Sequence, residues 1–306
     1  MPQSVFSLSP VFAYRVLYKG VLDKERPCEK FFRLPEKSII NFTPQVPLTE
    51  RKIIMAYRYD QDLEFLANCS SAELKDFAEL LIYDKDGNER LTGDMDLAKR
   101  YKYQPDCSQY WQELAAELQK FGGNSFANIL RGGEGVLYKE ILGDVCNKMK
   151  VKGFSEDKSI EWNEELFIVQ IMPSIIEQLP PDMLQAIAQE VGEENVNSLT
   201  PQAATALFIK IFRMGGFKSY QITLIIVNAI WKFLFGRGLT VATNATIARV
   251  LGILTGPIGW TLTGIWTALD IASPAFRITV PAVFQIILLR KLSTHRALIE
   301  EQKSNQ

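Results

Sequence analysis

Residues 70–81 read SSAELKDFAELL, and this stretch predicts an amphipathic helix with a defined beginning. Ser70 and Glu73 have the spacing of a capping box, in which the serine hydroxyl accepts the Glu73 amide and the glutamate reaches back to the Ser70 amide. Leucine and phenylalanine recur at positions 74, 77, 80 and 81, so they form one apolar stripe. The Asp86-Gly87-Asn88 sequence that follows is typical of a turn.

The same helical pattern continues along most of the chain. Further apolar stripes predict helices near residues 108–120 and 136–150. Pro181 and Thr200-Pro201 are typical helix beginnings, because proline is tolerated in the first turn. Pro173 is expected to break or kink the helix that contains it. Strand patterns are scarce, so the sequence predicts an all-α, multi-helix protein.

Charge divides the chain into three blocks, although the net charge is −1. Residues 1–54 carry +4, residues 55–199 carry −13 and residues 200–306 carry +8. A basic, apolar end suits an anionic lipid surface, and it could equally dock on the acidic middle of the same chain. The basic residues are scattered singly among apolar ones, so we do not expect nucleic acid as a partner.

The pattern also predicts a domain organisation. Residues 1–55 are interrupted by prolines and are expected to be an irregular or disordered extension. Residues 56–152 form an acidic helical domain of unknown function. Residues 159–292 form a second helical domain with an apolar, glycine-containing end, and residues 293–306 form a polar tail.

The least charged part of the chain lies between Phe233 and Leu289, where 57 residues include only four charged ones. Within it, Val250–Leu269 has no charge over 20 residues. A helix of that length spans roughly 30 Å, about the thickness of the hydrocarbon core of a bilayer. We therefore expect membrane association through residues 222–292, as a segment that spans the bilayer or lies on it. The open alternative is that the segment is buried in a soluble core.

The residues expected to carry this contact are small, aromatic or basic. Gly252 and Gly256 form a GxxxG pattern, which lets two helix backbones approach closely. The candidates for helix packing or membrane contact are Gly252, Gly256, Gly259, Gly264, Trp260 and Trp266, and those for the basic flank are Arg237, Arg249, Arg277, Arg290 and Lys291.

The sequence offers little for catalysis. His295 is the only histidine, so catalytic triads and sites with several histidine ligands are excluded. The four cysteines lack CxxC spacing, so we expect reduced cytosolic thiols. Acidic pairs such as Glu164-Glu165 are expected to be solvated on helix surfaces. We expect no enzyme activity, no cofactor and no metal. No secretory signal pattern is visible, so a cytoplasmic location at the inner face of the inner membrane is expected.

Four stretches together carry a family resemblance: YDQDLEFL at 59–66, AAELQKFGGNS at 115–125, NILRG at 128–132 and RITVPAVFQI at 277–286. They resemble the YaaW-type family of uncharacterised bacterial proteins, over roughly residues 55–292. That family is grouped by similarity with ubiquinol–cytochrome c chaperone-like proteins. The resemblance therefore implies an alternative function, a soluble chaperone or assembly factor for a membrane respiratory complex. Besides anionic membrane lipid, the partner would be a protein client or a second copy. The resemblance transfers no functional residues.

Two expectations about altered chains follow from these patterns. If residues 222–292 face lipid, a chain that ends near Ser219 should be soluble. If Gly87 keeps a negative φ, Gly87→Ala should cost no more than about 1 kcal/mol.

Overall fold

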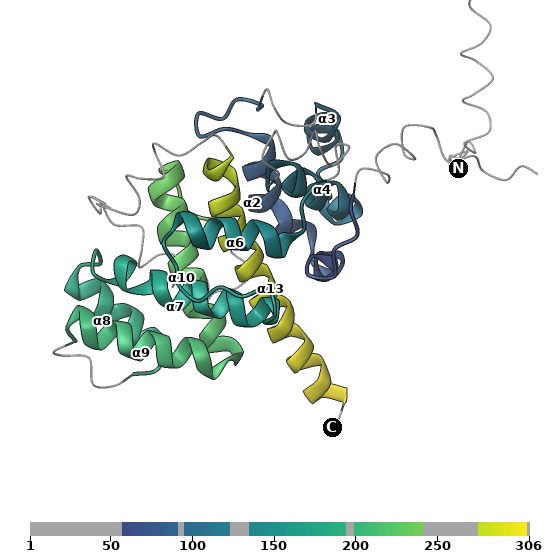
Figure 1. Ribbon diagram of the computed structural model, residues 1–306. Coiled ribbons are helices and arrows are strands. Elements are labelled where there is room, and N and C mark those ends of the chain that lie inside the picture. Colours follow the sequence, from purple (N-terminus) through teal and green to yellow (C-terminus); the bar gives the residue numbers. More distant parts are fainter. Residues whose placement is uncertain (1–56, 91–94, 123–134, 194–198, 241–274, 305–306) are drawn as a thin grey trace, which may run out of the picture. The chain divides into compact units, whose positions relative to one another are not determined.

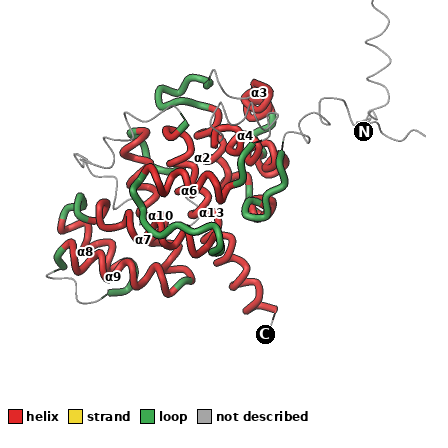
Figure 2. The backbone as a smooth tube through the Cα atoms, in the orientation of Figure 1, coloured by secondary structure: helices red, strands yellow, loops and turns green. Residues whose placement is uncertain are grey.

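The computed structural model describes residues 57–90, 95–122, 135–193, 199–240 and 275–304 (Figure 1). Within these ranges the chain is helical, and no β-strand occurs (Figure 2). This confirms the all-α prediction. The α-helices are α2 (Ser71–Ile82), α3 (Met95–Tyr103), α4 (Trp111–Gly122), α6 (Tyr138–Lys148), α7 (Ile160–Ile176), α8 (Pro181–Glu190), α9 (Pro201–Met214), α10 (Gly216–Phe235) and α13 (Phe276–Ser304), and the 3₁₀-helices are η2 (Glu64–Asn68) and η3 (Cys107–Tyr110).

Helix α2 begins as its sequence predicts. The Ser70 hydroxyl accepts the Glu73 amide at 3.4 Å, and the Glu73 carboxylate accepts the Ser70 amide at 2.7 Å. The four residues of the apolar stripe are all buried, with exposed fractions of 2% or less. Capping and burial therefore agree in fixing where this helix starts and which face it buries.

The turn after α2 forms where it was predicted, but Gly87 does not keep the negative φ on which the small cost of alanine depended. The Asp84 carboxylate accepts the amides of Asp86 and Asn88, both at 2.9 Å, which closes the turn. Gly87 has φ of +83°, a conformation that favours glycine. The condition of a negative φ is therefore not met, and alanine at this position is strained even though the space around it is open.

The prolines act mainly at helix beginnings. Pro181 and Pro201 are the first residues of α8 and α9, and the Thr200 hydroxyl accepts the Ala203 amide at 3.2 Å. Pro173 lies inside α7, and that helix continues to Ile176. Pro173 therefore does not end its helix.

Helices α10 and α13 are the longest of the described elements and lie antiparallel beside one another (Figure 1). The rings of Phe217, at the start of α10, and His295, late in α13, are 4.9 Å apart. Every residue from 219 to 231 and from 278 to 289 is buried. A helix that is apolar all round belongs to a core or to a membrane, and these two helices occupy the core of this chain.

Helices from both predicted domains contribute to that core. Helix α13 packs against α2, α4 and α6, which belong to the acidic region, while α10 packs against α7 and α9. The Phe167 and Phe284 rings, from α7 and α13, are 4.9 Å apart. The predicted domain boundaries stay a prediction, but a chain that ends near Ser219 would lack both central helices. Its behaviour would therefore reflect the loss of the core as well as the loss of any membrane contact, so it does not test membrane contact.

Among the helices that the structure describes, none combines the length and apolar character needed to cross a bilayer.

Candidate functional site

The predicted membrane-contact residues fall into two groups. Those from the central apolar segment lie in 241–274, outside the described residues: Arg249, Gly252, Gly256, Gly259, Gly264, Trp260 and Trp266. The remaining basic candidates are Arg237, Arg277, Arg290 and Lys291, and the structure describes all four.

Arg290 lies in a buried ion pair. Its Nε donates to both carboxylate oxygens of Glu164, at 3.0 and 3.1 Å, and its Nη2 donates to the Asp62 carbonyl at 2.6 Å. The guanidinium also stacks 4.4 Å above the Phe65 ring. The side chains of Arg290 and Glu164 are only 13% and 4% exposed. Arg290 is therefore part of the core, and its assignment to an exposed basic flank is corrected.

Two further residues complete this buried cluster. The Tyr138 hydroxyl donates to Glu164 at 3.0 Å, and the Tyr138 amide donates to the Asp60 carboxylate at 2.6 Å. Burial raises the pKa of Glu164, and the Arg290 guanidinium opposes that rise. Burial and the Glu164 carboxylate raise the pKa of Tyr138 well above its usual value. Because its polar groups satisfy one another, the cluster joins the segment before η2 to α6, α7 and α13.

Arg237, just after α10, makes a second contact with the acidic region. Its guanidinium pairs with Glu79 at 2.8 Å and lies 3.7 Å from Asp76, both on α2. The Thr240 amide also donates to Asp76 at 2.8 Å. Burial raises the pKa of Asp76, while its bond from Thr240 and the charge of Arg237 oppose the rise. These contacts link the segment that follows α10 to helix α2.

Arg296 makes the third contact. It pairs with Glu73 at 3.1 Å and donates to the Asn68 carbonyl at 2.8 Å. We call Arg237, Arg290 and Arg296 the arginine clamp. All of their carboxylate partners belong to the block of charge −13, so the basic end of the chain does dock on its acidic middle. This docking depends on charge attraction and also on geometry, because each guanidinium contacts a second acceptor besides its main carboxylate partner.

The other two basic candidates differ in exposure. Lys291 is partly buried, with its ammonium 4.5 Å from the centre of the Phe212 ring, and burial lowers its pKa. Arg277 is exposed at the beginning of α13. Of the four described basic candidates, Arg237 and Arg277 are therefore the exposed ones.

The described residues offer no group of histidine, cysteine and carboxylate side chains that could hold a metal ion. Cys69, Cys107 and Cys146 are free and buried. Burial raises the pKa of both Cys69 and Cys146 to about 12, so these thiols stay protonated at neutral pH and are poor nucleophiles. The polar clusters described above link helices, and their geometry suggests a structural role.

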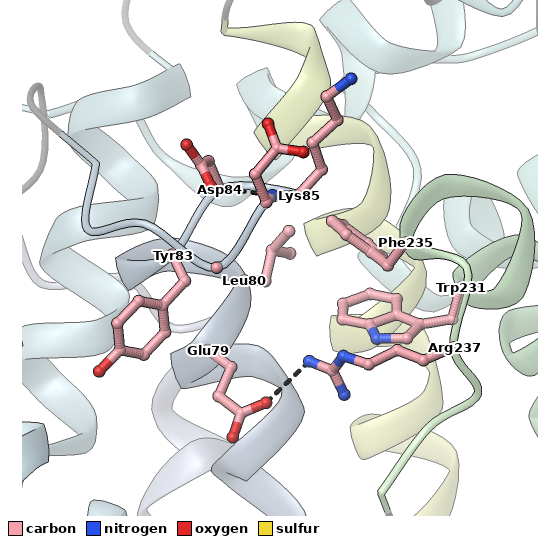
Figure 3. A pocket seen from close by; sticks show the side chains of 10 residues that line it. Glu79, Leu80, Tyr83, Asp84, Lys85, Trp231, Phe235 and Arg237 are labelled. Carbon is pink, nitrogen blue, oxygen red and sulfur yellow. Dashed lines mark hydrogen bonds and ion pairs between the residues drawn. The ribbon is translucent and has the colours of Figure 1, made fainter.

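A pocket lies between the C-terminal ends of α2 and α10, next to Arg237 (Figure 3). Its volume is about 420 Å³. The residues that line it are Glu79, Leu80, Tyr83, Asp84, Lys85, Asp86, Gly87, Trp231, Phe235 and Arg237.

These features define an all-helical protein whose basic C-terminal part is linked to its acidic part by ion pairs. Sequence comparison then gives its family. Residues 57–91 match a domain of unknown function, DUF3944. The chain is 42% identical to a UPF0174 protein of Helicobacter pylori strain J99 over 253 residues, 82% of this chain and 98% of that protein. It is 33% identical to the UPF0174 protein YaaW of Escherichia coli K12 over 245 residues, 77% and 96% of the two chains.

The chain therefore belongs to the UPF0174 family, which confirms the YaaW-type resemblance. No solved structure matches it. The names of these relatives do not bear on the chaperone grouping, which stays a prediction.

Proposed function

We propose that this chain is a non-enzymatic protein that associates with the cytoplasmic face of a bacterial inner membrane through apolar residues between 241 and 274. The observation that carries this proposal is the uncharged run Val250–Leu269. As a helix, a run of this length would match the thickness of a bilayer's hydrocarbon core. The run is therefore a candidate for lipid contact.

The fold narrows the region proposed for lipid contact from the one that the sequence suggested. Residues 219–231 of α10 and 278–289 of α13 are buried in the core of the chain, so their apolar surface is already covered. The apolar residues left for lipid contact are those between the two helices. Helices α10 and α13, which precede and follow these residues, pack side by side. Such an arrangement suits insertion of a hairpin.

Charge supports the same proposal. The uncharged run lies between Arg249 and Asp270, and Arg277, which follows further along the chain, is exposed on the described surface. Each basic residue near an anionic lipid surface contributes about 1 kcal/mol to the free energy of membrane binding. The arginine clamp is engaged with carboxylates of the chain itself and is assigned a structural role.

Replacing residues 250–269 with a glycine–serine segment of equal length should abolish membrane binding and leave the helical body folded. The replacement keeps α10, α13 and the arginine clamp, so it removes only the apolar run. The measurement is co-sedimentation with vesicles of phosphatidylglycerol and phosphatidylethanolamine at low salt, with circular dichroism to verify folding. Arg277→Gln should weaken binding about fivefold, the equivalent of about 1 kcal/mol.

Arg213→Gln is the matched control for Arg277→Gln, because Arg213 is also exposed but lies at the end of α9. It should leave vesicle binding unchanged. The proposal is wrong if the unaltered chain stays in the supernatant without detergent, or if the glycine–serine chain binds equally well.

The second candidate function is a soluble chaperone or assembly factor. The burial of α10 and α13 in one core favours it, because most of the described apolar sequence is then accounted for without lipid. This alternative would be supported if the unaltered chain does not bind vesicles but binds a protein client through residues 250–269.

A further inference from the structure

The pocket beside Arg237 has the dimensions of a small-molecule site. Its volume is about 420 Å³, and sites that hold small ligands usually measure roughly 300–1,000 Å³. It is formed by residues far apart in the sequence, from the end of α2, the turn at 84–87 and the end of α10. In Figure 3 the Leu80, Phe235 and Trp231 side chains lie near one another, and those of Tyr83 and Lys85 are directed away from them.

The floor of the pocket is apolar. The Trp231 and Phe235 rings are 4.7 Å apart, and Leu80 from α2 lies across from them (Figure 3). Trp231 is fully buried, whereas Phe235 is only partly buried. Such a floor suits a flat apolar ring, since aromatic rings pack well at these separations.

The pocket lining carries three carboxylates, from Glu79, Asp84 and Asp86, and two cations, from Lys85 and Arg237. Arg237 pairs with Glu79, which also accepts the Tyr101 hydroxyl at 2.9 Å. The Asp84 carboxylate accepts two amides of its own turn. Lys85 and Asp86 are exposed and opposite in charge, and Figure 3 shows the Lys85 ammonium directed away from the Trp231 ring. The floor itself carries no charge, so the pocket favours a neutral ligand.

One polar group of the pocket has no partner. The indole Nε1 of Trp231 is buried and makes no hydrogen bond within the described part of the chain. Unsatisfied buried donors are uncommon, so a donor of this kind beside a cavity indicates a missing acceptor. Trp231 lies beside Arg237, whose side chain is 47% exposed (Figure 3). For an acceptor to reach the indole nitrogen, the Arg237 side chain has to move away from Glu79 and Asp76.

We propose that this pocket binds a small neutral molecule that combines an apolar ring with a carbonyl acceptor, such as an aromatic amide. The ring packs on Trp231, Phe235 and Leu80. The carbonyl oxygen accepts the Trp231 indole N–H. This binding site does not depend on the membrane association proposed above.

The test compares three single-ring probes with the full-length chain: benzamide, benzoate and benzylamine. They share the ring and differ in carrying a neutral, an anionic or a cationic group. The readout is the indole N–H resonance of Trp231 in a ¹H–¹⁵N spectrum, assigned by its loss in Trp231→Phe. Benzamide should shift this resonance in a saturable manner and bind more tightly than either charged probe.

Two variants separate the hydrogen bond from the apolar contact. Trp231→Phe should weaken benzamide binding about threefold to tenfold, the worth of one hydrogen bond. Because this variant lacks the reporting indole, its affinity is measured by titration calorimetry. Trp111→Phe is its matched control, because Trp111 is only partly buried and packs edge-on against Tyr57, outside the pocket. If Trp231→Phe fails to fold, Phe235→Ala is used instead. It removes one ring from the pocket floor and keeps the Trp231 indole that reports binding.

Phe235→Ala should also weaken benzamide binding. The proposal is overturned if benzamide leaves the Trp231 resonance unchanged, or if benzoate or benzylamine binds as tightly. It is also overturned if the folded variants bind benzamide as the unaltered chain does.

Discussion

Replacing Arg290 with methionine is expected to lower the free energy of unfolding by about 3–5 kcal/mol, because the change leaves the Glu164 carboxylate buried without a counter-charge. Glu164 is 4% exposed and accepts from Arg290 and Tyr138. Methionine keeps the apolar length of the side chain, so the loss is chiefly electrostatic. Urea unfolding followed by circular dichroism measures the change.

Two further variants make this prediction specific. Arg213→Met breaks the exposed pair between Arg213 and Glu165, whose side chains are 58% and 40% exposed. It should cost less than about 1 kcal/mol. Adding Glu164→Leu to Arg290→Met should recover much of the stability, because both charges are then removed. If Arg290→Met costs no more than Arg213→Met, the buried pair is not the central contact described here.

Phe284→Ala should be about as destabilising, by roughly 3–5 kcal/mol, through lost burial and the cavity it leaves. Phe284 is fully buried on α13, and its ring lies 4.9 Å from that of Phe167 on α7. The variant should lower the midpoint of thermal unfolding in a single transition, because α13 contributes to the same core as α2, α4 and α6. Differential scanning calorimetry gives both the midpoint and the number of transitions.

The matched control is Phe276→Ala, which makes the same change at the partly buried start of α13. It should cost distinctly less than Phe284→Ala. Equal losses at the two positions would mean that the middle of α13 is not the core element that its burial indicates. Two separate transitions would mean that the predicted domains unfold independently.

Local rules predicted the beginnings of three of the described helices. The beginnings of α2, α8 and α9 depend on neighbours within four residues, such as Ser70 with Glu73 and Thr200 with Pro201. Interactions of this range are legible in a sequence because they need no knowledge of the fold. The positive φ of Gly87 was not predicted, because the Asp86-Gly87-Asn88 pattern predicts a turn but not which turn type forms.

The arginine clamp could not be predicted pair by pair. Arg290 and Glu164 are 126 residues apart, and the sequence shows Arg290 only as a charge after an apolar run. A membrane-flanking residue has the same signature. The sequence predicted that Glu164 and Glu165 are both solvated. In the structure the Glu164 side chain is buried, whereas the Glu165 side chain is exposed and pairs with Arg213. Their difference comes from helical rotation of about 100° per residue, which turns Glu164 toward α13.

The apolar helices show a related ambiguity. A segment that is apolar on every side must be buried, but the pattern does not say whether lipid or protein covers it. For residues 219–231 and 278–289 the covering is protein. The sequence alone had grouped them with Val250–Leu269 in one membrane-contact region.

Hydrogen–deuterium exchange of the full-length chain, free and bound to anionic vesicles, tests this account most directly. We predict that peptides within 219–231 and 278–289 keep the same strong protection in both states, because these helices stay in the protein core. Peptides within 250–269 should become more protected on binding. Loss of protection in α10 and α13 on the vesicles, or unchanged exchange within 250–269, would contradict the account.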